Sequence, residues 1–206
     1  MKKLVLAALA VALMAGSVFS EGREMKIKLG LETMGAAGFN YDGNRGIDID
    51  SDIGLGMALE FLFPVSNIVK IGPAIGYSFA RYLKLSDSMQ AVTNINKQSL
   101  SFVPIYATIE VNPIKSAAEV FLKGNIGVNY GTVSVEGTIP AFGPFPAYPY
   151  KTSDYHLGFY YGLGAGYNFP FGLFLDALYS WNIMYEVGGS ITYSKLTISA
   201  GYRFGI

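Results

Sequence analysis

The chain has 206 residues, of which 51% are hydrophobic, with 15 basic and 15 acidic residues and no cysteine. The lack of cysteine excludes disulfides, thiol chemistry, cysteine-ligated metals and a lipid anchor on cysteine. The balanced charge gives no reason to expect nucleic acid as a partner or a polybasic membrane patch.

The N-terminal segment has the pattern of a secretory signal peptide. The basic start Met1–Lys3 precedes an apolar run, Leu4–Ala15, and small residues lead up to Ser20. A transmembrane helix is the alternative, but it needs about 20 apolar residues, and this run is much shorter. We therefore expect residues 1–20 to be cleaved after Ser20. Residues 21–206 then form one domain, in which 13 basic residues remain against 15 acidic ones.

Eight segments of the remaining chain alternate between apolar and small or polar residues, which is the period of a β-strand. They are approximately Met25–Met34, Asp52–Phe63, Ile68–Lys84, Ser99–Asn112, Glu119–Glu136, Tyr155–Phe169, Leu173–Ile183 and Ile191–Phe204. The sixth is the clearest, because its odd positions are all apolar or aromatic and four of its even positions are glycine. Its aromatics lie toward both ends with Leu163 and Ala165 between them, as expected where a strand crosses a bilayer.

The connections between these segments alternate in length. Long polar connections are predicted at Gly38–Ser51 and Ser86–Lys97. A third long connection is predicted at Gly137–Asp154, whose four prolines exclude a central strand. Short turns are predicted at Pro64–Asn67, Pro113–Ala118, Pro170–Gly172 and Gly188–Gly189. An even strand number with this alternation predicts an all-β fold, an eight-stranded antiparallel transmembrane up-and-down β-barrel. A soluble barrel of the lipocalin type is the alternative. Its exposed face would be glycine, alanine and tyrosine, with too few charges to solvate it.

The C-terminal sequence Ser199–Phe204 is similar to the signal that ends small outer-membrane β-barrels of Gram-negative bacteria. Gly201, Tyr202 and Phe204 match its glycine and two aromatics, although two further residues follow Phe204. Over its whole length the chain resembles this group, which contains the opacity proteins, OmpX, OmpW and the OmpA membrane domain. The resemblance implies export through the periplasm, recognition by the outer-membrane insertion machinery, and residence in the bacterial outer membrane among its lipids and lipopolysaccharide.

Three local patterns suggest chemistry that we do not predict. The glycines of Gly162–Gly166 lack the helix that a dinucleotide-binding loop requires. The acidic run Asp48–Asp52 departs from a calcium loop at the following positions, which leaves only weak contact with divalent cations or lipopolysaccharide as an alternative. His156 follows Ser153 and Asp154, as a lipid-modifying outer-membrane enzyme would need, but neighbouring residues of a strand point to opposite faces. We predict no catalytic, metal or cofactor site.

The inward faces of the predicted strands carry charged residues of both signs, and an eight-stranded barrel leaves room only for side chains. A buried charge needs a partner, so we predict an interior salt-bridge network. Its candidates are Lys28, Glu60, Lys70, Glu110, Lys123, Asp176 and Arg203. From the turn positions we expect Glu60 opposite Lys70 and Glu110 opposite Lys123.

A plugged barrel of this size predicts a non-enzymatic surface protein, structural or adhesive, which presents its extracellular loops. The candidate loop is Gly137–Asp154, in which Phe142, Phe145, Tyr148 and Tyr150 offer apolar surface to an extracellular ligand or a host surface. Folding of this loop over the barrel mouth is an equally open interpretation. The alternative function is a narrow channel for small apolar solutes, resembling OmpW and lined by Tyr160 and the glycines of its strand.

Overall fold

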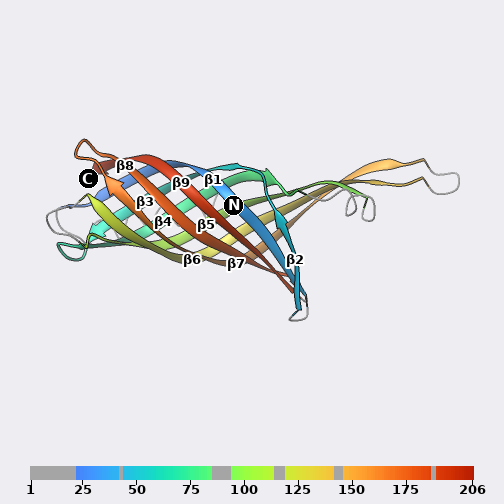
Figure 1. Ribbon diagram of the computed structural model, residues 1–206, viewed down its shortest axis with the longest axis horizontal. Coiled ribbons are helices and arrows are strands. Elements are labelled where there is room, and N and C mark those ends of the chain that lie inside the picture. The colour runs from blue at the N-terminus through green and yellow to red at the C-terminus, as the bar shows by residue number, and fades with distance from the viewer. Residues whose placement is uncertain (1–21, 42–43, 85–93, 114–118, 142–145, 187–188) are drawn as a thin grey trace.

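The computed structural model describes residues 22–41, 44–84, 94–113, 119–141, 146–186 and 189–206, which form one closed antiparallel sheet (Figure 1). Its strands are β1 (Glu24–Tyr41), β2 (Asn44–Asp50), β3 (Gly54–Pro64), β4 (Val69–Tyr82), β5 (Ile95–Val111), β6 (Val120–Ile139), β7 (Tyr148–Asn168), β8 (Leu173–Glu186) and β9 (Gly189–Gly205). Among the described residues, no helix is long and apolar enough to cross a membrane. The predicted signal peptide, residues 1–20, lies outside them and stays a prediction.

These strands occupy eight positions around the barrel. One edge of β1 pairs with β9 from Glu24 to Tyr41, which closes the ring. The other edge pairs first with β3, up to Glu32, and then with β2, from Ala36 onward. Because β2 and β3 follow each other along the same edge of β1, they count as one interrupted strand. The all-β, eight-stranded antiparallel barrel expected from the alternation is therefore confirmed.

A bulge in β1 causes the interruption. Met34 has a positive φ of 50°, and the pairing of β1 with β9 shifts register between Thr33 and Ala36. The amide of Ser51 donates to the carbonyl of Gly35 at 2.8 Å, which holds the break between β2 and β3 against the bulge. A bulge bends a strand and increases its twist, so the β1–β2 hairpin diverges from the barrel axis (Figure 1).

Two of the long connections predicted as loops are largely paired strands. Most of Gly38–Ser51 belongs to the β1–β2 hairpin, and most of Gly137–Asp154 extends β6 and β7. Pro149, one of the prolines expected to exclude a central strand, lies opposite Thr138. That part of β7 has no partner from β8, and proline is tolerated on such an edge. The loop predictions were wrong because neither segment has the strict alternation of the membrane-crossing strands, although both can pair.

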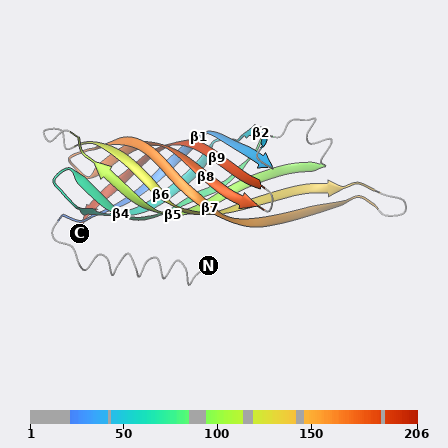
Figure 2. The ribbon, with the colours of Figure 1, turned by 90° about the horizontal axis from the view of Figure 1, so that it is seen from below.

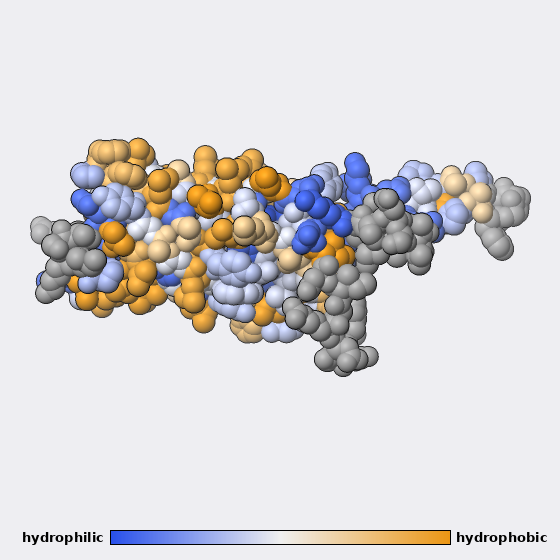
Figure 3. Space-filling view, in the orientation of Figure 1, coloured by the Kyte–Doolittle hydropathy of each residue, from blue (hydrophilic) through white to orange (hydrophobic). Residues whose placement is uncertain are grey.

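The two faces of the sheet have opposite polarity. Outward side chains form an apolar belt (Figure 3), in which Leu29 is 66% and Leu163 67% exposed. Inward side chains include fully buried charges such as Lys26, Glu60 and Glu110. This arrangement is the inverse of a soluble barrel, so the lipocalin-type alternative is excluded.

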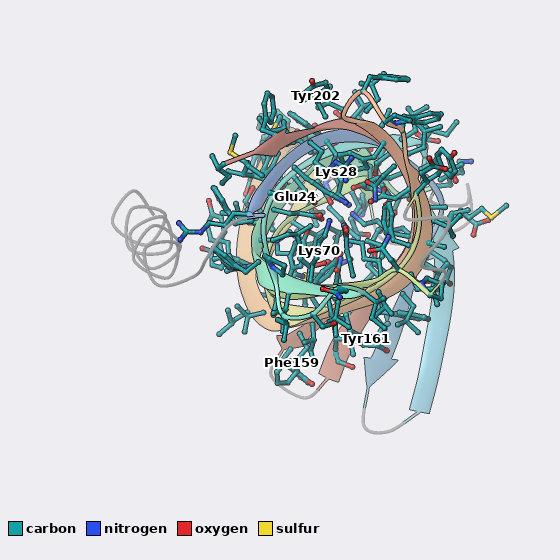
Figure 4. All side chains as sticks on the ribbon, turned by 90° about the vertical axis from the view of Figure 1, so that its left-hand side faces the viewer. Glu24, Lys28, Lys70, Phe159, Tyr161 and Tyr202 are labelled. Atoms are coloured by element: carbon teal, nitrogen blue, oxygen red, sulfur yellow. The ribbon has the colours of Figure 1, made fainter. Side chains whose placement is uncertain are left out.

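Aromatic rings mark the outward face around the belt. Near the short turns, Tyr202 and Phe204 contact each other with ring centroids 4.7 Å apart. On the β7–β8 wall, Tyr161 and Trp181 stack at 4.8 Å. Figure 4 shows Tyr202, Tyr161 and Phe159 pointing away from the barrel axis. Amphipathic aromatic side chains of this kind anchor a barrel at the lipid–water interfaces.

Candidate functional site

The first layer of the interior is a balanced group of six charges, here called the central cluster: Lys26, Lys28, Glu60, Glu110, Lys123 and Asp176. Lys123 lies 2.5 Å from Glu60 and 3.4 Å from Glu110, and Lys28 lies 3.1 Å from Glu60. Lys26 bonds Glu110 at 2.7 Å and Lys28 bonds Asp176 at 2.9 Å. Three ammonium groups thus face three carboxylates across the lumen, and each charge has a partner of opposite sign.

Aromatic side chains close the lumen on both sides of the central cluster. Toward the short turns, the Nζ atom of Lys26 lies 4.3 Å from the ring centroid of Phe121 and 4.8 Å from that of Phe174. On the other side, Tyr106 and Tyr160 pack at 4.9 Å, and the Tyr106 hydroxyl donates to Glu60 at 3.1 Å. Tyr160 was expected to line a channel in the alternative function, but its side chain fills the lumen.

The second layer, here called the upper cluster, consists of Glu32, Arg81 and Lys195 with Ser78 and Tyr193. Glu32 pairs with Arg81, accepts from Lys195 at 2.6 Å and accepts from Ser78 at 2.8 Å. Arg81 also donates to the Tyr193 hydroxyl at 2.9 Å. A cavity of about 40 Å³ adjoins Lys28 of the central cluster and Lys195 of the upper one.

An apolar layer, here called the cap, closes the interior beyond the upper cluster, toward the long hairpins. Its buried members include Leu83, Leu100, Val133, Met184 and Ile191. Phe102 stacks on Tyr193 at 5.2 Å and joins the cap to the upper cluster. The described side chains therefore fill the lumen from one end to the other, apart from the small cavity.

The predicted salt-bridge candidates all point inward, but one predicted pairing is wrong. Glu60 lies opposite Ala74 rather than Lys70. The β3–β4 turn is centred near Asn67, since Val65 bonds across it to Val69, two residues later than we assumed. A displacement by an even number of residues keeps every side chain on its predicted face.

The remaining candidates are Lys70, Arg203 and Glu110. Lys70 and Arg203 both reach Glu24, at 2.7 and 3.3 Å, and form a rim of three charges at the short-turn end (Figure 4). Glu110 lies directly opposite Lys123, in the register expected from the turn. Lys26, Glu24 and Arg81 also belong to the network and were not among the predicted candidates.

Arg81 was missed for a structural reason. By strict alternation it would share the outward face of Phe79. The pairing of β4 with β5 shifts register between Ser78 and Arg81, and this irregularity turns the guanidinium inward. Gly54 leaves room for it, because a Cβ atom there would lie 2.8 Å from the Cζ atom of Arg81.

We expect Gly54→Val to destabilise the barrel by about 1–3 kcal/mol, the usual cost of overpacking. The added side chain must displace a guanidinium that Glu32 and Tyr193 hold in place. The measurement is the midpoint of urea unfolding in lipid vesicles. Gly205→Ala is the control, since a Cβ atom at Gly205 meets nothing within 4 Å. Equal midpoints for both variants would contradict the proposed crowding.

The most prominent external feature is the extension of β6 and β7, here called the arm (Figures 1 and 2). The last β7–β8 pair is Gly158 with Met184, whereas β6–β7 pairing continues to Ile139 with Tyr148. Outside the belt, the Ser134 and Ser153 hydroxyls bond at 2.8 Å. β5 also pairs with the other edge of β6 as far as Gly137, so the arm has three strands up to Gly137 and two beyond it.

An exposed ion pair also joins the strands of the arm. The Nζ atom of Lys151 lies 2.5 Å from a Glu136 carboxylate oxygen. The hydrogen bond from Lys151, with its charge, lowers the pKa of Glu136, and Glu136 in turn raises the pKa of Lys151. Both groups consequently stay charged at neutral pH.

Two of the predicted interaction residues can be placed on the arm. Tyr148 is 54% exposed at its outer part, and the Tyr150 ring lies against Gly137 and is half-buried. Phe142 and Phe145 lie outside the described residues. The ribbon continues away from the barrel (Figure 2), so its described part does not fold over the mouth.

The structure also shows the surroundings of the serine–histidine pattern and of the acidic run Asp48–Asp52, for which no site was predicted. The Ser153 hydroxyl bonds the Ser134 hydroxyl across the arm. Asp52, in the acidic run, lies 3.7 Å from Lys84 and so faces a cation. The part of the chain that is described holds no group of three or more histidine, aspartate or glutamate side chains arranged to bind a metal.

The predicted insertion signal forms the end of β9. Tyr202 and Phe204 point outward, and the Phe174 ring lies close to Gly201 on the other face. Recognition of these residues by the insertion machinery stays a prediction.

The family model described as "Outer membrane protein beta-barrel domain" matches residues 4–204. Among solved structures, the chain is similar to Neisserial surface protein A, with a TM-score of 0.56 and 13% identity over 89% of this chain and 100% of that one. A major outer membrane protein of Thermus thermophilus has a TM-score of 0.54 and 14% identity over 89% and 100% of the two chains. For Ail of Yersinia pestis, in complex with the heparin analogue sucrose octasulfate, the values are 0.53 and 17% over 88% and 99%.

At such identities these similarities show the fold alone, and no curated protein matches the chain. The family match, in contrast, covers nearly the whole sequence. It agrees with the closed ring of strands, the apolar belt and the charged interior described above. The chain is a bacterial outer-membrane protein and belongs to the outer membrane protein beta-barrel domain family.

Proposed function

We propose that the protein is a non-enzymatic surface protein whose closed barrel holds the arm outside the cell for contact with a ligand or a host surface. One observation carries the proposal. β6 and β7 stay paired well beyond the last residue of β7 that β8 supports, Gly158. On its other edge β6 pairs with β5 as far as Gly137, and beyond Gly137 only β6 and β7 remain, a two-stranded form that is marginally stable alone. The regular pairing of β6 and β7 outside the barrel favours a role for the surface of the arm.

The position of the arm supports this role. In outer-membrane barrels the short turns face the periplasm and the long connections face the outside. The arm leaves the end opposite the short turns, as Figure 1 shows, and thus extends into the extracellular medium. Tyr148 offers exposed aromatic surface there, and exposed aromatic groups frequently serve as anchors in interfaces.

The interior supports a scaffold rather than a channel. The central cluster, the upper cluster and the cap follow one another along the lumen, and the cavity between the clusters measures only about 40 Å³. A path for solutes would require several charged pairs and aromatic contacts to separate together. We therefore expect the barrel to be electrically silent.

The arm can be shortened without disturbing the barrel, because Gly137 and Tyr150 lie directly opposite each other. Residues 138–149 are replaced by Asn-Gly, which forms a two-residue hairpin turn. A second variant keeps the full length and carries Phe142→Ser, Phe145→Ser and Tyr148→Ser. Faster migration of unheated than of boiled protein on a detergent gel verifies folding of each.

We expect cells displaying the wild-type protein to adhere to epithelial cells, matrix proteins or heparin, and both variants to adhere less. Loss of an aromatic anchor costs about 2 kcal/mol, or about thirtyfold in affinity. In parallel, the purified barrel is reconstituted in planar bilayers. Adhesion equal to that of cells lacking the protein would overturn the proposal, as would reproducible ion conductance with unchanged adhesion of both variants.

A further inference from the structure

The two ionic layers inside the barrel differ in their charge balance. The central cluster has three cations and three anions, whereas the upper cluster has two cations, Arg81 and Lys195, for one anion, Glu32. The rim at the short-turn end has the same excess, since Lys70 and Arg203 share Glu24. Among the described side chains, the interior thus holds one surplus positive charge at each of two levels.

Only one of these surplus charges is shielded from water. At the rim the side chains of Lys70, Arg203 and Glu24 are 20%, 23% and 14% exposed, so solvent and mobile counter-ions reach them. In the upper cluster, Arg81 is fully buried and Lys195 nearly so. The cap covers one side and the Tyr106–Tyr160 pair the other. An uncompensated charge in such surroundings is strongly unfavourable.

The cavity beside this surplus charge is lined by residues that can donate hydrogen bonds to an anion. The ammonium-bearing side chains of Lys28 and Lys195 line it, together with the hydroxyl-bearing Ser78, Ser180 and Ser199. The Oγ atom of Ser180 is buried and has no hydrogen-bond partner in the protein. A hydroxyl and an ammonium group both donate hydrogen bonds to anions. Glu32 also lines the cavity, but Arg81, Lys195 and Ser78 already engage its carboxylate.

The size of the cavity limits the anion. About 15 Å³ of such space holds one water molecule. About 40 Å³ therefore accepts a monatomic ion with one or two waters, but no sulfate, phosphate or carboxylic acid of biological size.

We propose that this cavity is a binding site for a small monovalent anion of the halide class, with chloride as the natural occupant. The ion lies between Lys28, Lys195 and Ser180 and acts as a fixed counter-ion for the upper cluster. It links the two ionic layers and contributes to closing the lumen. The proposal concerns the interior alone and is independent of what the arm binds.

The test uses the full mature barrel, refolded and crystallised in sodium bromide, whose anion scatters anomalously. We expect an anomalous peak in the cavity between Lys195 and Ser180. In a second measurement, unfolding is followed at constant ionic strength while gluconate, which is too large for the cavity, is replaced by chloride. At a chloride concentration ten times the Kd, the folded-to-unfolded ratio rises about elevenfold by mass action.

Two variants separate this site from general salt effects. Lys195→Met removes the surplus charge and leaves Arg81 to pair with Glu32, so the chloride dependence should disappear. Lys70→Met removes the same formal charge at the open rim and should keep the full dependence. A cavity without a bromide peak would overturn the proposal, and so would an equal chloride dependence in the wild type and in Lys195→Met.

Discussion

Replacement of Glu60 by glutamine is expected to lower the free energy of unfolding by about 3–5 kcal/mol, because it leaves buried ammonium groups without their partner. Glu60 is fully buried and lies between Lys123, at 2.5 Å, and Lys28, at 3.1 Å. Glutamine keeps the size of the side chain and removes only the charge. Urea unfolding in lipid vesicles, followed by the fluorescence of the single tryptophan, Trp181, measures the change.

Two controls show whether this cost comes from burial of unpaired charge. The double variant Glu60→Leu with Lys123→Leu removes one charge of each sign and should recover most of the loss, since the central cluster stays balanced. Glu136→Gln breaks an ion pair that water screens on the arm and should leave the unfolding midpoint unchanged. Equal effects of the Glu60 and Glu136 single variants would refute the buried network.

Replacement of Leu163 by lysine is expected to cost about 2–4 kcal/mol, the cost of a basic side chain at the middle of the bilayer on the outside of a barrel. Leu163 points outward from β7, in the stretch between Tyr155 and Tyr167. The substitution removes no described hydrogen bond or ion pair. Its effect therefore reports the surroundings of the outer face, and it is measured by urea unfolding in vesicles as above.

Leu157→Lys is the matched control, since Leu157 is a leucine on the same strand and face with almost the same exposure. Six residues of a strand tilted by about 40° correspond to roughly 15 Å along the membrane normal. The lysine at this position thus reaches the interface and should cost only about 0–1 kcal/mol. If both lysines have the same cost, the belt has been placed at the wrong height.

The direction of most side chains could be predicted because it depends on a local property. A strand has a period of two residues, so Leu163 outward and Gly162 inward follow from the order of residues alone. An error in register does not affect this result if it is even, as the β3–β4 turn shows. Arg81 is the exception, because the register shift beside it reverses the alternation and leaves no pattern in the sequence.

The interior contacts could not be predicted in the same way. Glu60 and Lys123 are on β3 and β6, which are not neighbours in the sheet, and they meet only across the lumen. Their distance depends on the tilt and stagger of the closed barrel, which no single strand determines. Turn positions relate only neighbouring strands, which is why Lys70 of β4 was predicted as the partner of Glu60.

The amino-acid sequence by itself determined the outer-membrane barrel, the number of strand positions and the lipid-facing side chains, because alternation and turn residues act within a few residues of each other. Only the tertiary structure decided which buried charges pair, how Arg81 turns inward and how far the arm extends. These features depend on closure of the ring and on bulges, which bring together residues distant in the chain. The surplus charge of the upper cluster likewise becomes apparent only when Glu32, Arg81 and Lys195 meet in one closed space.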